Sequence, residues 1–132
     1  MSSSRFNKPG PNFVPAFQIS GVPYVTSSFG VGAAPTNVKF PYATRFFQLT
    51  NLGDTHLRIG FTANGVNANP ASNAHYLIVS GGVTTERLEL RCKELFVRTD
   101  AGTGGSFSLI AGLTGIEEFP VLSGSNEFKG VG

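Results

Sequence analysis

Residues 40–61, FPYATRFFQLTNLGDTHLRIGF, decide the expected fold class. Residues 44–50 are rich in aromatic and β-branched side chains, which favour strands, and residues 51–54 (NLGD) have the composition of a turn. Residues 56–62 then alternate between two faces: Leu57, Ile59 and Phe61 on one, and His56, Arg58 and Gly60 on the other. Two such strands joined by a short turn predict a half-buried antiparallel hairpin.

Six more segments on either side have strand character: residues 21–29, 36–40, 75–80, 84–90, 94–99 and 106–112. In the last of them Phe107, Leu109 and Ala111 fall on one face. They are short, they are separated by Gly, Pro and Asn, and nothing between them has the pattern of a long amphipathic helix. We therefore expect an all-β fold, a single eight-stranded jelly-roll sandwich, because an immunoglobulin-like sandwich more often has seven strands. Residues 64–73 (NGVNANPASN) are expected to form an exposed loop.

The 132 residues suffice for one domain, which we expect at residues 21–113 between an extended N-terminal arm (1–20) and a C-terminal tail (114–132). Three prolines prevent a continuous helix in the arm, yet both ends are too apolar for ordinary solvated tails. We expect the ends to contact a neighbouring subunit; for the N-terminal arm, folding back on its own domain and simple disorder are the alternatives. The expected contact residues are Phe6, Phe13, Phe17, Phe119 and Leu122.

Charged residues make up only 14% of the chain, against about 25% in ordinary soluble domains. A surface with so few charges suits a protein that packs against copies of itself or partners, although neutral Gly- and Ser-rich loops would give a similar composition. The ten basic residues form no run, so no nucleic-acid partner is expected. Residues 86–98 interleave basic residues with glutamates, which predicts a solvated or cross-strand-paired face.

The chain offers few groups for chemistry, so we expect no enzyme, no catalytic residue, no cofactor and no metal. A metal site would need His56 and His75 at one end of the sandwich with a third ligand such as Asp54. Cys92 has no partner for an internal disulfide. Its place between apolar positions predicts a small buried hydrophobe, while the neighbouring Arg91 and Lys93 leave a reactive thiol as the alternative.

No segment approaches the roughly 18 consecutive apolar residues of a transmembrane helix. The first residues, MSSSRFNKPGPNF, lack the apolar centre of a signal peptide. We therefore expect a protein that has no membrane-spanning segment and is made in a reducing cytoplasm.

The body of the chain resembles the small single-jelly-roll capsid proteins of icosahedral DNA viruses. The resemblance covers roughly residues 20–125 and rests on GVPYVTSS, FPYATRFFQLTN, HLRIGFTANGV, TTERLELRCKELFV and SFSLIAGLTGIEEFPVLSGS. It is greatest to the penton and minor capsid proteins that accompany double-jelly-roll major capsid proteins. It implies a virion protein, made in the host cytoplasm, that forms a homo-oligomeric ring, a pentamer, at the vertices of the shell beside the major capsid protein.

Two other functions fit the same architecture. One is a capsid decoration or cement protein, which would bind tightly only on its shell. The other is a carbohydrate-binding jelly-roll module, in which Tyr42 and Tyr76, with residues 64–73, would provide an aromatic platform for a glycan.

Overall fold

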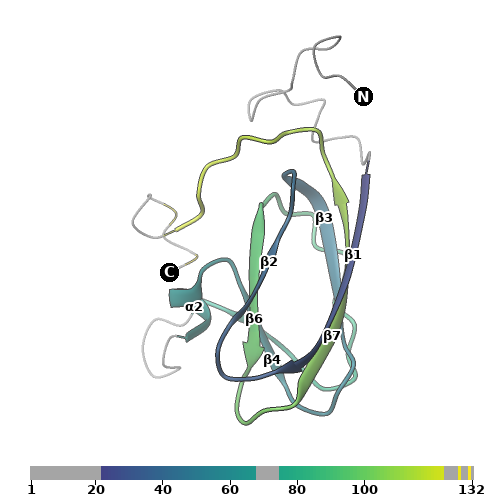
Figure 1. The fold of residues 1–132 in the computed structure, drawn as a ribbon, viewed down its shortest axis with the longest axis vertical. Coiled ribbons are helices and arrows are strands. Elements are labelled where there is room, and N and C mark those ends of the chain that lie inside the picture. Colours follow the sequence, from purple (N-terminus) through teal and green to yellow (C-terminus); the bar gives the residue numbers. More distant parts are fainter. Residues whose placement is uncertain (1–21, 68–74, 124–127, 129–130, 132) are drawn as a thin grey trace.

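The computed structural model describes residues 22–67, 75–123, 128 and 131. In this part of the chain two antiparallel sheets face each other, and the only helix has a single turn (Figure 1). The elements are β1 (Val22–Val31), β2 (Thr36–Lys39), β3 (Thr44–Asn51), β4 (Leu57–Gly60), α2 (Ala63–Asn67), β5 (Leu77–Val79), β6 (Glu94–Thr99) and β7 (Gly105–Leu113). The strand orders are β1-β7-β3 and β2-β6-β4-β5. The all-β prediction is confirmed.

The strands pair in a nested order. β1 pairs with β7, β2 with β6 and β4 with β5, each time antiparallel. Residues 83–88 run along β3, where the Phe47 and Leu88 backbones exchange hydrogen bonds of 3.0 and 2.8 Å and the Asn51 amide donates to the Val83 carbonyl at 2.9 Å. The chain is thus doubled back on itself about the connection between β4 and β5.

The expected strand at residues 84–90 is not a regular strand, which corrects the count of eight. It makes only two isolated bridges to β3, Phe47 with Leu88 and Thr50 with Thr84. The two bridges are three residues apart on β3 but four residues apart on the other segment. The extra residue interrupts the ladder as a bulge does. The Thr85 side chain occupies the gap, because its Oγ1 accepts a hydrogen bond from the Leu49 amide at 3.0 Å.

The predicted hairpin between β3 and β4 is wrong. β3 pairs with β7 in one sheet, while β4 pairs with β5 and β6 in the other. The buried Asn51 side chain stabilises the connection from β3 in one sheet to β4 in the other. Its Nδ2 donates to the Thr55 and Val79 carbonyls at 2.8 and 3.0 Å, and its Oδ1 accepts from the Gly53 amide at 3.1 Å. Alternation identifies a half-buried strand but not its partner.

The inward faces of the two sheets form one hydrophobic core, as the alternation predicted for Leu57 and Ile59. A bulge in β1 changes which residues of this strand point into the core. Gly30 has a φ of +74°, a left-handed conformation that glycine adopts without steric cost. The register with β7 shifts at this point, so Phe29 lies outside and Val31 lies in the core. The largest fully buried side chains include Phe47, Leu49, Leu57, Leu95, Phe107, Leu109 and Leu113.

The first part of the expected loop at residues 64–73 is instead the helix α2, and residues 68–73 lie outside the described part of the chain. The helix begins after Thr62, whose Oγ1 accepts a hydrogen bond from the Gly65 amide at 2.8 Å as an N-cap does. α2 packs on β4 and β6. It thereby buries Arg58, which the alternation had placed on the outward side of its strand.

The described part of the C-terminal segment packs on its own domain. β7 ends at Leu113, after which the Thr114 amide donates to the Ala43 carbonyl and the Ala43 amide donates to the Ile116 carbonyl, both at 2.8 Å. Near the end of the chain, the Thr62 hydroxyl donates to the Val131 carbonyl at 2.6 Å. The described residues of the tail thus contact their own domain, and contact of the tail with a neighbouring subunit stays a prediction.

Candidate subunit-contact surface

The outer face of the sheet β1-β7-β3 carries no charge over its two longest strands. Neither β1 (VPYVTSSFGV) nor β7 (GSFSLIAGL) contains a charged residue. Because side chains alternate along a strand, one set from each strand faces away from the core. The outward set is Pro23, Val25, Ser27 and Phe29 from β1, and Ser106, Ser108, Ile110 and Gly112 from β7. The structure thus presents an uncharged surface over these two strands.

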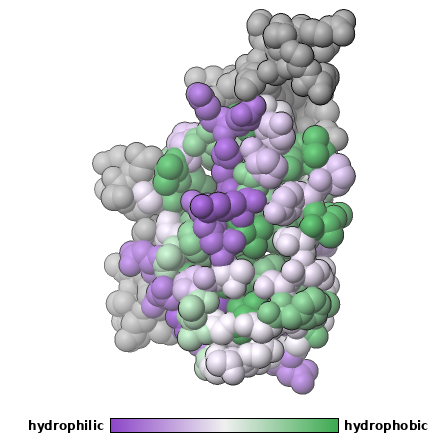
Figure 2. Space-filling view, viewed as in Figure 1, coloured by the Kyte–Doolittle hydropathy of each residue, from purple (hydrophilic) through white to green (hydrophobic). Residues whose placement is uncertain are grey.

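Hydrophobic side chains occupy the middle and one end of this outer face. Val25 is 68% exposed, Phe29 74% and Ile110 44%, and Val25 and Ile110 are direct partners across the ladder. The adjacent pair, Ser27 and Ser108, is joined by a hydroxyl hydrogen bond of 2.8 Å. Figure 2 shows hydrophobic side chains along the margin where β1 and β7 run, and a band of hydrophilic side chains over β2 and β6.

Charged residues line only the far side of this face, beyond β7. Glu89 accepts from Arg87 at 3.0 Å and lies 3.7 Å from Arg45 on β3, and the Arg87 guanidinium sits 5.2 Å from the centre of the Phe46 ring. The pair Arg45–Glu89 joins two neighbouring segments, as a cross-strand-paired face would, whereas Arg87 and Glu89 pair within one segment. Because the side chains are exposed, the ion pairs add little to stability. They give the face a polar rim.

The expected contact residues of the tail lie elsewhere. Phe119 is half-buried against Ala43 and Ile116, and Leu122 packs against the main core. Both line a pocket of about 320 Å³ beside the ends of β2 and β6. Phe6, Phe13 and Phe17 lie outside the described residues. Contact of all five with a neighbouring subunit stays a prediction.

The two histidines lie at opposite ends of one ladder. His56 precedes β4 and His75 precedes β5, and these strands are antiparallel with Leu57 opposite Val79. His56 Nδ1 accepts a hydrogen bond from the Gly81 amide at 3.2 Å. Nowhere in the described part of the chain do three His, Cys, Asp or Glu side chains come together as metal ligands would. The described residues also contain no helix of the length and hydropathy needed to span a membrane.

Cys92 is fully buried, as the pattern predicted. Burial raises the pKa of its thiol to about 11, because removing the thiolate from water costs more than the weak contact with Thr44 Oγ1 (3.5 Å) recovers. The thiolate is the nucleophilic form of cysteine. The alternative of a reactive thiol activated by Arg91 and Lys93 therefore finds no support in the electrostatics of this site.

We expect Cys92 in the folded protein to react with iodoacetamide at pH 8 at least about 100-fold more slowly than in the unfolded chain, because a free thiol has a pKa of about 8.5. Mass spectrometry of the labelled protein measures both rates. Val83→Cys, which adds a thiol at an exposed position outside β1 and β7, provides the control and should take up one label quickly. Fast labelling of Cys92 itself in the folded wild type would contradict the burial.

The tyrosines of the expected glycan platform are each partly covered. Tyr42 packs against the core, and the Arg58 guanidinium lies 4.3 Å from the centre of the Tyr76 ring.

Sequence reasoning missed the apolar outer face of β1 and β7. The alternation in residues 106–112, which put Phe107, Leu109 and Ala111 on one side, already left Ile110 on the other.

No family model matches the chain, and neither the curated proteins nor the solved structures give a significant match.

Proposed function

We propose that this chain is a non-enzymatic, single-jelly-roll structural protein of an icosahedral viral capsid. In this proposal it forms a homo-oligomeric ring, a pentamer, at the vertices of the shell, beside the major capsid protein of the virion. The observation that carries the proposal is the nested order of strand pairing.

In a jelly roll an antiparallel ribbon of eight strands is wound into two sheets, so that the first strand pairs with the eighth, the second with the seventh, and so on. With residues 83–88 counted as the sixth strand, the sheets here have the orders 1-8-3-6 and 2-7-4-5. Every neighbouring pair in these orders is antiparallel. This agreement supports the jelly roll, with the sixth strand reduced to an irregular edge.

The surface supports an assembling rather than a catalytic role. The outer face of β1 and β7 is uncharged and partly apolar, as the centres of protein interfaces are. A rigid sandwich with such a side can make one contact with the next copy, and closed rotational symmetry turns that contact into a ring. The terminal arms expected from the sequence would extend the contact.

Light scattering on the purified chain, combined with electron microscopy of the particles, tests the proposal. The expected mass is five times the 13.9 kDa of one chain, and the expected image is a ring with five-fold symmetry. A trimer, or a monomer that binds only to assembled shells, would instead indicate a decoration protein. A monomer that binds sugars on a glycan array would indicate a carbohydrate-binding module.

A further inference from the structure

We infer that a second copy of this chain covers the outer face of β1 and β7, with Val25, Phe29 and Ile110 in the contact. The inference rests on the proposed function, because it names the surface through which the proposed ring is held together. It adds the sheet itself to the terminal aromatic residues as a contact surface.

Charge favours a copy of the chain over other partners. The face has no lysine or arginine to attract a nucleic acid or an anionic membrane. It also has no charge pattern that would select a foreign protein by electrostatic complementarity. An uncharged face can be buried without leaving an unpaired charge in the contact. Since copies of the chain are always present together, they are the partner that such a neutral face meets first.

The edge of the sheet leads to the same surface. Among the described strands β1 pairs only with β7, so the ten residues of β1 form one edge of the sheet. Proteins usually protect such edges with lysine, proline or bulges, because an open edge invites another strand. Here Pro23 and the Gly30 bulge stand near the two ends, and nothing of this kind protects residues 24–28 between them. A neighbouring copy seated on this side of the molecule would shield the exposed edge from pairing with other strands.

The size of the face can be compared with that of a stable subunit contact. At about 3.3 Å per residue and about 4.8 Å between strands, β1 and β7 span about 30 by 10 Å, or about 300 Å². Stable interfaces bury about 800 Å² on each partner. The face therefore supplies part of that area, and the terminal arms expected from the sequence would supply the remainder.

The test is a double variant, Val25→Lys with Ile110→Lys, studied by light scattering at the concentrations at which the wild type associates. We expect its mass to fall to the 13.9 kDa of a single chain, because two buried lysines without partners cannot be accommodated in the contact. Both side chains are exposed in the single chain, so the far-ultraviolet circular dichroism should not change. Val25→Lys alone, the milder variant, serves if the double variant does not fold.

The matched control is Val83→Lys, a substitution at a similarly exposed valine (46%) that lies outside β1 and β7. It should keep the oligomer. If the lysine variants that fold also keep the oligomer, the inferred face is wrong while the proposed ring stands. If the wild type forms an oligomer of another number and the double variant dissociates it, the face stands and the proposed pentamer is wrong. A wild type that remains a single chain would overturn both.

Discussion

Replacing Phe47 by alanine is expected to lower the free energy of unfolding by about 3–5 kcal/mol, the cost of removing a large aromatic ring from a packed core. Phe47 is 0% exposed. Its ring packs edge-on against Phe61 with centroids 6.3 Å apart, and its backbone holds residues 83–88 against β3 through Leu88. Denaturant titration followed by circular dichroism measures the loss, with wild type and variant at equal concentration because association adds to stability.

The control for this prediction is the neighbouring residue on the same strand. Phe46 points to the outer side of the sheet, where it meets the Arg87 guanidinium at 5.2 Å. Phe46→Ala removes the same atoms from a half-buried side chain, so we expect a smaller loss than for Phe47, about 1–2 kcal/mol from its partial burial and the contact with Arg87. Equal losses from the two variants would mean that β3 does not present its faces as described.

The difference between Phe46 and Phe47 also shows what the sequence can and cannot predict. Two adjacent phenylalanines do not reveal which one faces the core, since a bulge between Thr44 and Phe46 resets the alternation. In β4 and β7 the alternation has no such interruption, and the inward positions Leu57, Ile59 and Phe107 were predicted correctly. Periodicity predicts which side chains face the core wherever the strand is regular.

Strand partners were beyond the reach of local pattern. The turn composition of residues 51–54 suggested a hairpin, because asparagine and glycine favour tight turns. In the structure Asn51 instead bonds to Val79 of the opposite sheet, a contact 28 residues away that no local signal reveals. The helix α2 was missed for a related reason, since Asn64 and Gly65 have low helix propensity and packing on β4 and β6 compensates for it.

The candidate surface was predictable only in part. Ile110 could be placed outside from the alternation of its strand. In β1 both sides carry similar residues, with Tyr24 and Thr26 on one and Val25 and Phe29 on the other, so the pattern did not say which side would be buried. The pairing register with β7 determines which side of β1 is buried, because the inward residues of β7 face the core.

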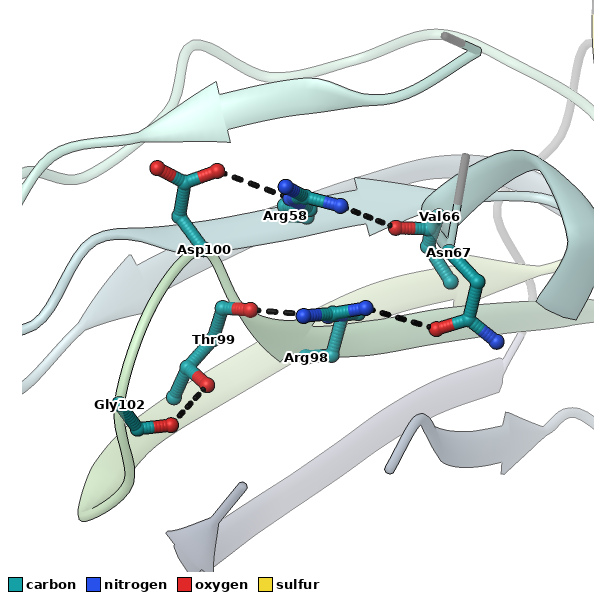
Figure 3. Close-up of polar contacts among 7 residues, drawn as sticks. All are labelled: Arg58, Val66, Asn67, Arg98, Thr99, Asp100 and Gly102. Carbon is teal, nitrogen blue, oxygen red and sulfur yellow. Dashed lines mark hydrogen bonds and ion pairs between the residues drawn. The ribbon is translucent and has the colours of Figure 1, made fainter. Parts of the chain in front are cut away.

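Replacing Arg58 by methionine is expected to lower the free energy of unfolding by about 2–4 kcal/mol. Arg58 is 6% exposed, and its guanidinium donates to Asp100 Oδ1 at 2.8 Å and to the Val66 carbonyl at 2.9 Å (Figure 3). It thereby ties β4 to both α2 and the residue after β6. Methionine keeps most of the volume but leaves two acceptors without this donor. Breaking a fully buried pair costs about 3–5 kcal/mol, and the 37% exposure of the Asp100 side chain reduces that cost.

Arg98 provides a matched control, because it lies directly opposite Arg58 in the ladder between β4 and β6. It donates to the Thr99 carbonyl and to Asn67 Oδ1, both at 2.9 Å (Figure 3), but its side chain is more exposed than that of Arg58. Arg98→Met should therefore cost less than about 1 kcal/mol. Denaturant titration compares the two variants, and hydrogen exchange should show that Arg58→Met loosens the amides of α2 more than Arg98→Met, which removes only a contact to the side chain of the last residue of the helix. Equal and small losses would mean that the burial of Arg58 contributes no more than an ordinary surface contact.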